Sequence, residues 1–117
     1  MGYSDATIRR GRAEMRINVE RDRADAQRGL ILRYLKQAGP RGATPAMLQK
    51  HLFEKSMPVF METLNELLHY LRECGYVTWD EVREEEYGPA GIGCVKITAA
   101  GINCVEGRAK ESDGVLL

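Results

Sequence analysis

The step from a leucine-rich helix into a strand at residues 75–77 is the feature that most restricts the fold of this chain. Leucines recur at helical spacing over residues 64–71, and Gly75 follows as a residue suited to end a helix. Tyr76 then opens a run of aromatic and β-branched residues that continues to Val82 and is typical of a strand. The sequence therefore predicts a helix that passes directly into a sheet.

Two further helices are predicted upstream. Apolar residues at helical spacing begin near Asp25 and stop at Gly39-Pro40, where glycine ends the helix and proline cannot continue it. Thr44-Pro45 predicts an N-cap with proline in the first turn of a second helix. This helix is expected to run to about Phe53 and to turn its leucines inward.

The leucine-rich third helix is expected to follow after a tight turn at Glu54-Lys55. Ser56 is the predicted N-cap and Pro58 lies in the predicted first turn, so the helix would extend to Gly75. The second helix, the turn and the third helix would then form a helix-turn-helix.

A second strand is predicted at Cys94–Thr98, after a glutamate- and glycine-rich loop at residues 83–93. A short helix at Ala99–Val105 would close the domain. The order predicts an α+β fold, a winged helix-turn-helix with three helices, a two-stranded β-wing and a short C-terminal helix. A generic α+β domain is the alternative.

The chain of 117 residues suits one compact domain. We expect a basic N-terminal arm at residues 1–23, the winged-helix domain at 24–108 and a C-terminal tail at 109–117. The 17 basic and 17 acidic residues balance, so no global field attracts a polyanion. Residues 1–36, however, contain nine arginines and lysines against five acidic residues, whereas residues 74–117 contain four against eight.

The segment from Leu30 to Ile97 resembles the winged-helix superfamily that includes the ArsR-like and MarR-like regulators, above all in its leucine spacing and the Gly75-Tyr76-Val77 step. The opening around Ala26-Gln27-Arg28 and the ending from Ile97 to Ala109 are similar to a small winged-helix protein of Mu-like phages and prophages. The resemblance implies a fold and a phage context, and it brings no catalytic residues.

The outward face of the third helix is acidic, which is unusual for a helix that reads DNA. At about 100° per residue, Met57, Phe60 and Met61 fall with the leucines on the core side. The opposite face carries Val59, Glu62, Glu66, His69, Tyr70 and Glu73. Carboxylates there would repel the phosphate backbone, and Glu84 to Glu86 would do so in the wing.

Basic residues instead concentrate in the arm. An arginine-rich arm can enter a minor groove or follow phosphates, although pairing of these arginines with interleaved acidic residues along a solvated helix is the alternative. The residues predicted to contact nucleic acid are Arg9, Arg10, Arg12, Arg16, Lys55, Ser56 and Thr63. The residues predicted for a protein-interaction surface, if that surface is used instead, are Val59, Glu62, Glu66, Tyr70 and a half-covered Trp79.

Catalytic and metal chemistry find little support. The chain lacks a nucleophile elbow, a phosphate loop and an HExxH motif, so we expect no enzyme, catalytic residue, cofactor or small-molecule substrate. His51, His69 and Cys74 lack the spacing of a metal site. Cys94 and Cys104 are expected to be buried thiols, and the odd cysteine number fits a cytoplasmic protein. No apolar run is long enough to span a membrane.

Two functions are compatible with these features. The first is a non-enzymatic, DNA-binding or transcription-regulatory factor of a Mu-like prophage that contacts double-stranded DNA mainly through its basic arm. The second is a protein-interaction or phage assembly and packaging adaptor that uses the acidic third helix and wing. A homodimer, or a complex with a phage protein, is compatible with both.

Overall fold

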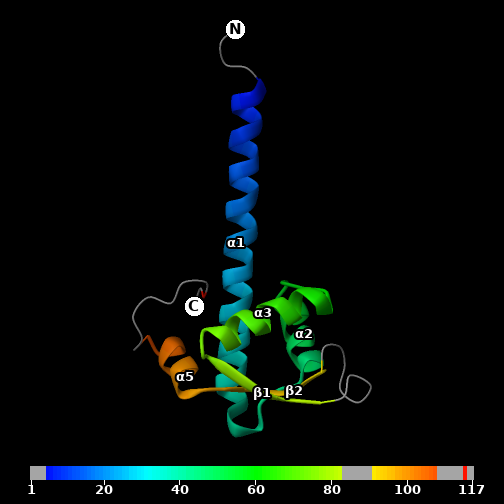
Figure 1. Cartoon of the computed structure of the whole chain (residues 1–117), viewed down its shortest axis with the longest axis vertical. Helices are drawn as coiled ribbons and strands as arrows, with labels where there is room; N and C mark the ends of the chain where they lie inside the picture. The colour runs from blue at the N-terminus through cyan, green and yellow to red at the C-terminus, as the bar shows by residue number, and fades with distance from the viewer. Residues whose placement is uncertain (1–4, 83–90, 108–114, 116–117) are drawn as a thin grey trace.

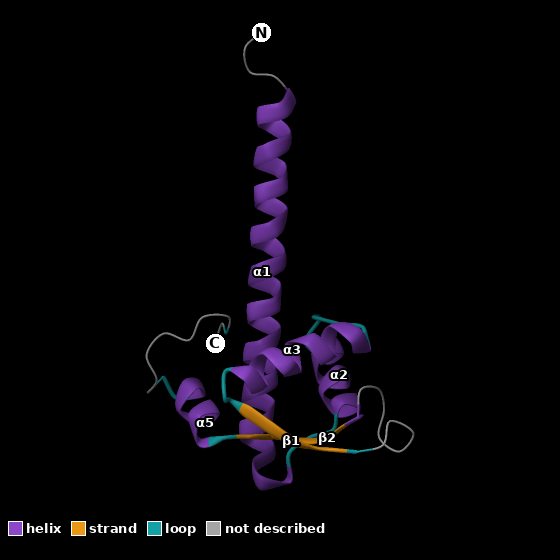
Figure 2. Cartoon of the chain, in the orientation of Figure 1, coloured by secondary structure: helices purple, strands orange, loops and turns teal. Residues whose placement is uncertain are grey.

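The computed structural model describes residues 5–82, 91–107 and 115, and within these it describes side chains from residue 20 onward. They form an α+β fold with four α-helices, one 3-10 turn and a two-stranded antiparallel sheet (Figures 1 and 2). Residues 83–90 of the predicted wing loop, and all of the predicted tail except Val115, lie outside the described residues. The elements are α1 (Asp5–Ala38), η1 (Gly39–Arg41), α2 (Pro45–Glu54), α3 (Met61–Glu73), β1 (Val77–Glu81), β2 (Ile92–Ile97) and α5 (Ala99–Val105).

The first helix begins at Asp5, so the predicted start near Asp25 is wrong. Residues 5–24 contain no proline and a single glycine, and they are rich in alanine, arginine and glutamate, which favour helix. Apolar periodicity missed this half because it has few large apolar side chains. Figure 1 shows that the first half of α1 extends away from the other elements, whereas its second half packs among them.

The second helix has the predicted cap. The Thr44 hydroxyl oxygen accepts a hydrogen bond from the Met47 backbone N–H at 3.3 Å, and Pro45 occupies the first helical position. The hydroxyl satisfies one of the N–H groups that the first helical turn leaves without a partner, and proline has no N–H to satisfy. The helix extends to Glu54, one residue beyond the predicted end.

The third helix begins at Met61, so the predicted start at Ser56 and the tight turn before it are wrong. Ser56 has a φ of 60°, which lies outside the right-handed helical region. Pro58 disfavours helical backbone at the preceding Met57. Residues 55–60 therefore form a link between α2 and α3, and Phe60 is the N-cap of α3 in extended conformation.

The predicted end of this helix at Gly75 is confirmed as a C-terminal glycine. Gly75 has a φ of 81°, and its N–H donates to the carbonyl of Arg72 at 2.9 Å. The next N–H, of Tyr76, donates to the carbonyl of Leu71 at 3.0 Å. This pair of bonds caps the helix and turns the chain into β1.

The sheet pairs Val77 with Ile97 and Trp79 with Val95, and an irregularity follows Trp79. Ala43, between η1 and α2, forms an isolated bridge to Val95, with both backbone hydrogen bonds made. After β2, the Thr98 hydroxyl caps α5 by accepting from Gly101 N–H at 3.1 Å, and α5 has the predicted bounds. The second strand begins at Ile92, two residues before its predicted start.

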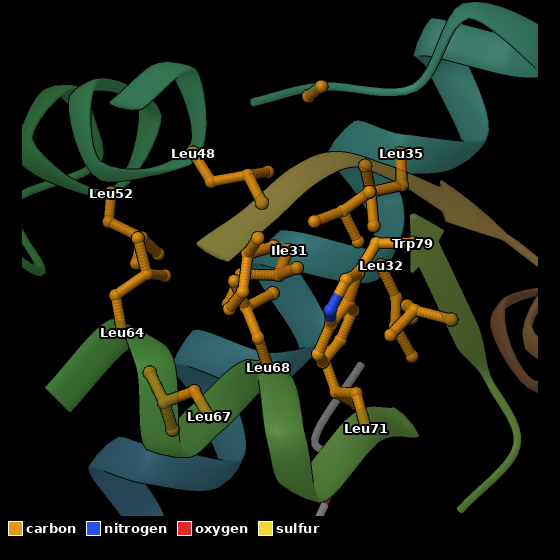
Figure 3. Close-up of a cluster of buried hydrophobic side chains, with 14 of the residues drawn as sticks. Ile31, Leu32, Leu35, Leu48, Leu52, Leu64, Leu67, Leu68, Leu71 and Trp79 are labelled. Atoms are coloured by element: carbon orange, nitrogen blue, oxygen red, sulfur yellow. The ribbon is translucent and has the colours of Figure 1, made fainter. Parts of the chain in front are cut away.

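The core lies between the second half of α1, α2, α3 and the sheet, and Figure 3 shows the leucines of α2 and α3 pointing toward those of α1. Its buried apolar side chains are Ile31, Leu32, Leu35, Ala43, Leu48, Leu52, Leu64, Leu67, Leu68, Leu71, Val77, Trp79, Ile92, Val95 and Cys104. Cys104 is buried as predicted. Cys94 is exposed, so its predicted burial is wrong, because it alternates with Val95 along β2 and Val95 faces the core.

Candidate functional site

The arginine-rich residues predicted to bind nucleic acid lie in a continuous helix. Arg9, Arg10, Arg12 and Arg16 all fall within α1, although their side chains lie outside the described part of the chain. At 1.5 Å per residue, residues 5–23 span about 28 Å. Figure 1 shows this half of α1 extending from the domain, so the four arginine positions lie along a helix away from the core.

The other three residues predicted to contact nucleic acid lie outside α1. Lys55 and Ser56 are exposed in the link between α2 and α3. Thr63 is exposed in the first turn of α3 and lines a groove with Glu20 of α1. The structure therefore does not gather the predicted residues into one patch.

The exposed face of α3 is acidic, as predicted. Glu62, Glu66 and Glu73 are exposed along it, together with His69. Val59 precedes the helix and is partly buried against the core, so its predicted place on this outward face is wrong. Val59 does not lie on the outward face of the helix because α3 begins only at Met61.

Tyr70 is half-buried on α3 and is covered by a side chain of α1. The Arg28 guanidinium lies 3.8 Å from the Tyr70 ring centroid, a cation–π contact. The same guanidinium donates to the Asp25 carboxylate at 3.0 Å. Tyr70 and Arg28 therefore join α1 to α3, which explains both side chains without an external partner.

Trp79 is only 6% exposed, so its predicted half-covered position is wrong. It faces the core from β1, with the Arg72 guanidinium 4.4 Å from its ring centroid and His69 edge-on at 5.2 Å. The alternation of Val77 and Trp79 toward the core explains this, because residues two apart in a strand share one face.

Phe60 is 81% exposed, so its predicted place on the core face is also wrong. Phe53, near the end of α2, is 70% exposed. The two rings flank the link, which sequence periodicity had assigned to helix. Large exposed aromatic side chains mark interaction surfaces more often than charged ones do.

Side chains of α1 and α2 donate hydrogen bonds to the backbone of the link. Gln27 of α1 donates to the Met57 carbonyl at 3.2 Å, and Gln49 of α2 donates to the Val59 carbonyl at 3.0 Å. Arg23 donates to the Pro58 carbonyl at 3.4 Å. These bonds satisfy carbonyl groups that a helix would have used internally.

An open groove of about 420 Å³ lies where α1 leaves the domain. Its walls are largely apolar and come from α1, the link and the start of α3. The lining residues are Glu20, Arg23, Ala24, Gln27, Pro58, Val59, Phe60 and Thr63. Sequence reasoning missed this groove because it joins segments more than thirty residues apart.

Two titratable groups among the described side chains have a pKa that departs from its ordinary value. Burial lowers the pKa of His51, with Lys55 acting in the same direction, and its ring lies 4.6 Å from that of Tyr34. Desolvation raises the pKa of the Cys74 thiol, and Arg28 opposes this only in part. A raised pKa disfavours the reactive thiolate.

Among the residues with described side chains, no cluster of histidine, cysteine, aspartate and glutamate could hold a metal ion. No helix in the described ranges is both long and apolar enough to cross a membrane; α1 has the length but is heavily charged. Comparison of the chain with protein-family models, curated proteins and solved structures finds no match.

Proposed function

We propose that this chain is a non-enzymatic winged-helix protein of a Mu-like prophage that acts as a DNA-associated regulatory factor. It contacts duplex DNA mainly through the arginine-rich first half of α1. The element order supports the winged-helix assignment: three helices, two antiparallel strands and a short closing helix follow one another as expected for that fold.

The observation that carries the DNA contact is the continuity of α1 from Asp5 to Ala38. A helix that extends from its domain can enter a major groove, which is wide enough to admit one. Arg9, Arg12 and Arg16 follow at three- and four-residue spacing, so they share a face of that helix. Arginines so placed can contact phosphates on neighbouring turns.

The acidic face of α3 favours DNA contact through α1 over DNA contact through the helix-turn-helix. Glu62, Glu66 and Glu73 are exposed where a recognition helix would approach the backbone. Because phosphate contacts supply most non-specific affinity, that face opposes DNA binding. The proposed contacts therefore lie outside the helix-turn-helix.

A mobility-shift series with duplex DNA at low salt tests this proposal. The full chain should bind, and replacing Arg9, Arg12 and Arg16 with glutamine should weaken binding about tenfold or more and reduce the salt slope by up to about three. Arg33→Gln, an exposed change within the domain, is the matched control. Equal binding by the triple variant and the control would overturn the proposal.

A protein-interaction or assembly adaptor is the second candidate function. The exposed Phe53 and Phe60 beside an acidic helix favour it. Charge reversal at Glu62 and Glu66 should then abolish capture of a phage partner without changing the circular dichroism of the domain. Unchanged capture would remove the reason to prefer it.

A further inference from the structure

The strand β1 lies at an edge of the sheet. On the other side of the sheet, the bridge between Ala43 and Val95 covers β2. Among the described residues, no strand or bridge pairs with the side of β1 opposite β2, which we call the outer edge of β1. A strand in this position presents backbone N–H and C=O groups to which another extended chain can pair.

The hydrogen bonds of the sheet show which backbone groups point to the outer edge. Thr98 N–H donates to the Tyr76 carbonyl at 2.9 Å, so these two residues are a hydrogen-bonded pair. Antiparallel strands alternate such pairs with pairs whose backbone groups point away from each other, so Trp79 directs its N–H and C=O away from β2. Val95, the partner of Trp79, agrees with this, because its N–H and C=O bond to Ala43 on the opposite side.

The side chains around the outer edge are mostly acidic. Asp80 and Glu81 are exposed on β1. The neighbouring helix α3 carries the exposed Glu66 and Glu73, and two other side chains of α3 contact the ring of Trp79. Four carboxylates therefore lie on the two elements that border this edge.

Two cations lie near these carboxylates, and neither closes the edge. The Arg72 guanidinium lies 4.4 Å from the Trp79 ring centroid. Lys96 is on β2, across from Thr78 and away from the outer edge. Because opposite charges on facing strands stabilise a sheet, a strand that carries lysine or arginine matches the charge of this edge.

A second copy of β1 does not match it. Antiparallel pairing of two β1 strands about a two-fold axis would bring Asp80 and Glu81 of both copies close together, and like charges on facing strands are destabilising. Charged side chains on edge strands commonly prevent association of identical chains in this way. A basic strand from a different protein avoids this repulsion.

We propose that the outer edge of β1 binds an extended, lysine- or arginine-bearing segment of a partner protein, which joins the sheet as an added strand. Main-chain hydrogen bonds to Trp79 supply affinity, and alternate side chains supply specificity. One face of the added strand lies beside Asp80 and the other beside Trp79 and Arg72, so basic residues should alternate with apolar ones. The inference goes beyond the DNA contact proposed for α1 and does not depend on it.

Titration of the full chain with a synthetic peptide of alternating lysine and valine tests the proposal. A label on the peptide gives the dissociation constant by fluorescence anisotropy, and the emission of Trp79, the single tryptophan, reports binding at this edge. The peptide should bind saturably and change the emission of Trp79. The same peptide with all its amides N-methylated keeps its charge but loses its main-chain donors, so it should bind at least about tenfold more weakly. Absence of saturable binding, or equal binding of the two peptides, would overturn the proposal.

Charge reversal tests the position of the added strand. The double variant Asp80→Lys, Glu81→Lys should bind the peptide about tenfold more weakly than the parent chain. The double variant Asp22→Lys, Glu54→Lys makes the same change of charge at exposed positions on α1 and α2, and should bind like the parent chain. Equal effects of the two double variants would mean that attraction is not local to β1 and would contradict the proposal. Dimers of the full chain that disappear in the β1 variant would assign the edge to a second copy and overturn it as well.

The variant with glutamine at Arg9, Arg12 and Arg16 separates this inference from the proposed function. It should bind the peptide like the parent chain, whatever its affinity for DNA. A parallel loss of peptide binding in this variant would contradict a site on β1.

Discussion

Gln27 of α1 and Met57 of the α2–α3 link are joined by a hydrogen bond of 3.2 Å from the side-chain amide to the backbone carbonyl. Gln27 is 4% exposed, so this amide is buried in the wall where helix and link meet. The bond fixes the link in a non-helical path and thereby shapes the groove above it.

Replacing Gln27 with leucine should lower the free energy of unfolding by about 1 to 2 kcal/mol, because the Met57 carbonyl loses its donor. Urea denaturation followed by circular dichroism measures this. Gln37→Leu, an exposed change on the same helix, should stay within about 0.5 kcal/mol. Equal stabilities of the two variants would show that the bond contributes nothing.

Gly101 brings α5 closer to Tyr76, the residue before β1, and to Ile97 at the end of β2 than any other residue type allows. A Cβ there would clash with the Tyr76 carbonyl oxygen and would lie 2.6 Å from the Ile97 side chain. That carbonyl also accepts the Thr98 N–H at 2.9 Å, so it cannot easily move. Gly101→Ala should therefore destabilise the fold by about 2 to 3 kcal/mol in thermal or urea unfolding. The neighbouring exposed Ala100→Ser is the control, and a similarly small effect of both changes would refute the close approach.

Trp79 is buried and Phe60 is exposed, which is the reverse of what their sequence positions predicted. Trp79→Ala should cost about 3 to 5 kcal/mol, because it empties a core site and removes the ring on which Arg72 lies. Phe60→Ala should change stability by less than about 0.5 kcal/mol, because the ring is 81% exposed. Far-ultraviolet circular dichroism can follow the unfolding of both variants, whereas tryptophan fluorescence cannot, because Trp79 is the single tryptophan. A tolerated loss of Trp79 would place it outside the core.

The parts of the fold that local chemistry determines could be predicted. Thr44 caps α2 and Gly75 ends α3 because each satisfies backbone groups within a few residues of itself. The predicted bounds of α5 are also confirmed, and in the structure the Thr98 side chain caps its first turn. Helix periodicity likewise placed the four leucines of α3 in the core.

The groove could not be predicted, because it depends on contacts between distant segments. Ser56 and Pro58 were assigned to a helix from capping preference, yet the positive φ of Ser56 and the bonds from Gln27 and Gln49 give a link instead. That shift of the helix start exposed Phe60. Pattern alone does not contain the pairing of Gln27 with a carbonyl thirty positions away.

The half-buried His51 should give the protein an acid-sensitive contribution to stability. Its pKa in the folded state lies below the ordinary value of 6.5, chiefly because burial disfavours the charged ring. Below pH 6.5 the unfolded chain therefore binds more protons at this site, and stability falls as the pH drops until the folded pKa is passed. His51→Phe keeps an aromatic ring beside Tyr34 and removes the titration. Urea unfolding at pH 7, 6 and 5 should show a shallower loss for the variant than for the parent chain. Parallel curves would mean that His51 titrates alike in both states, because contributions from the carboxylates are common to the two proteins and cancel in the difference.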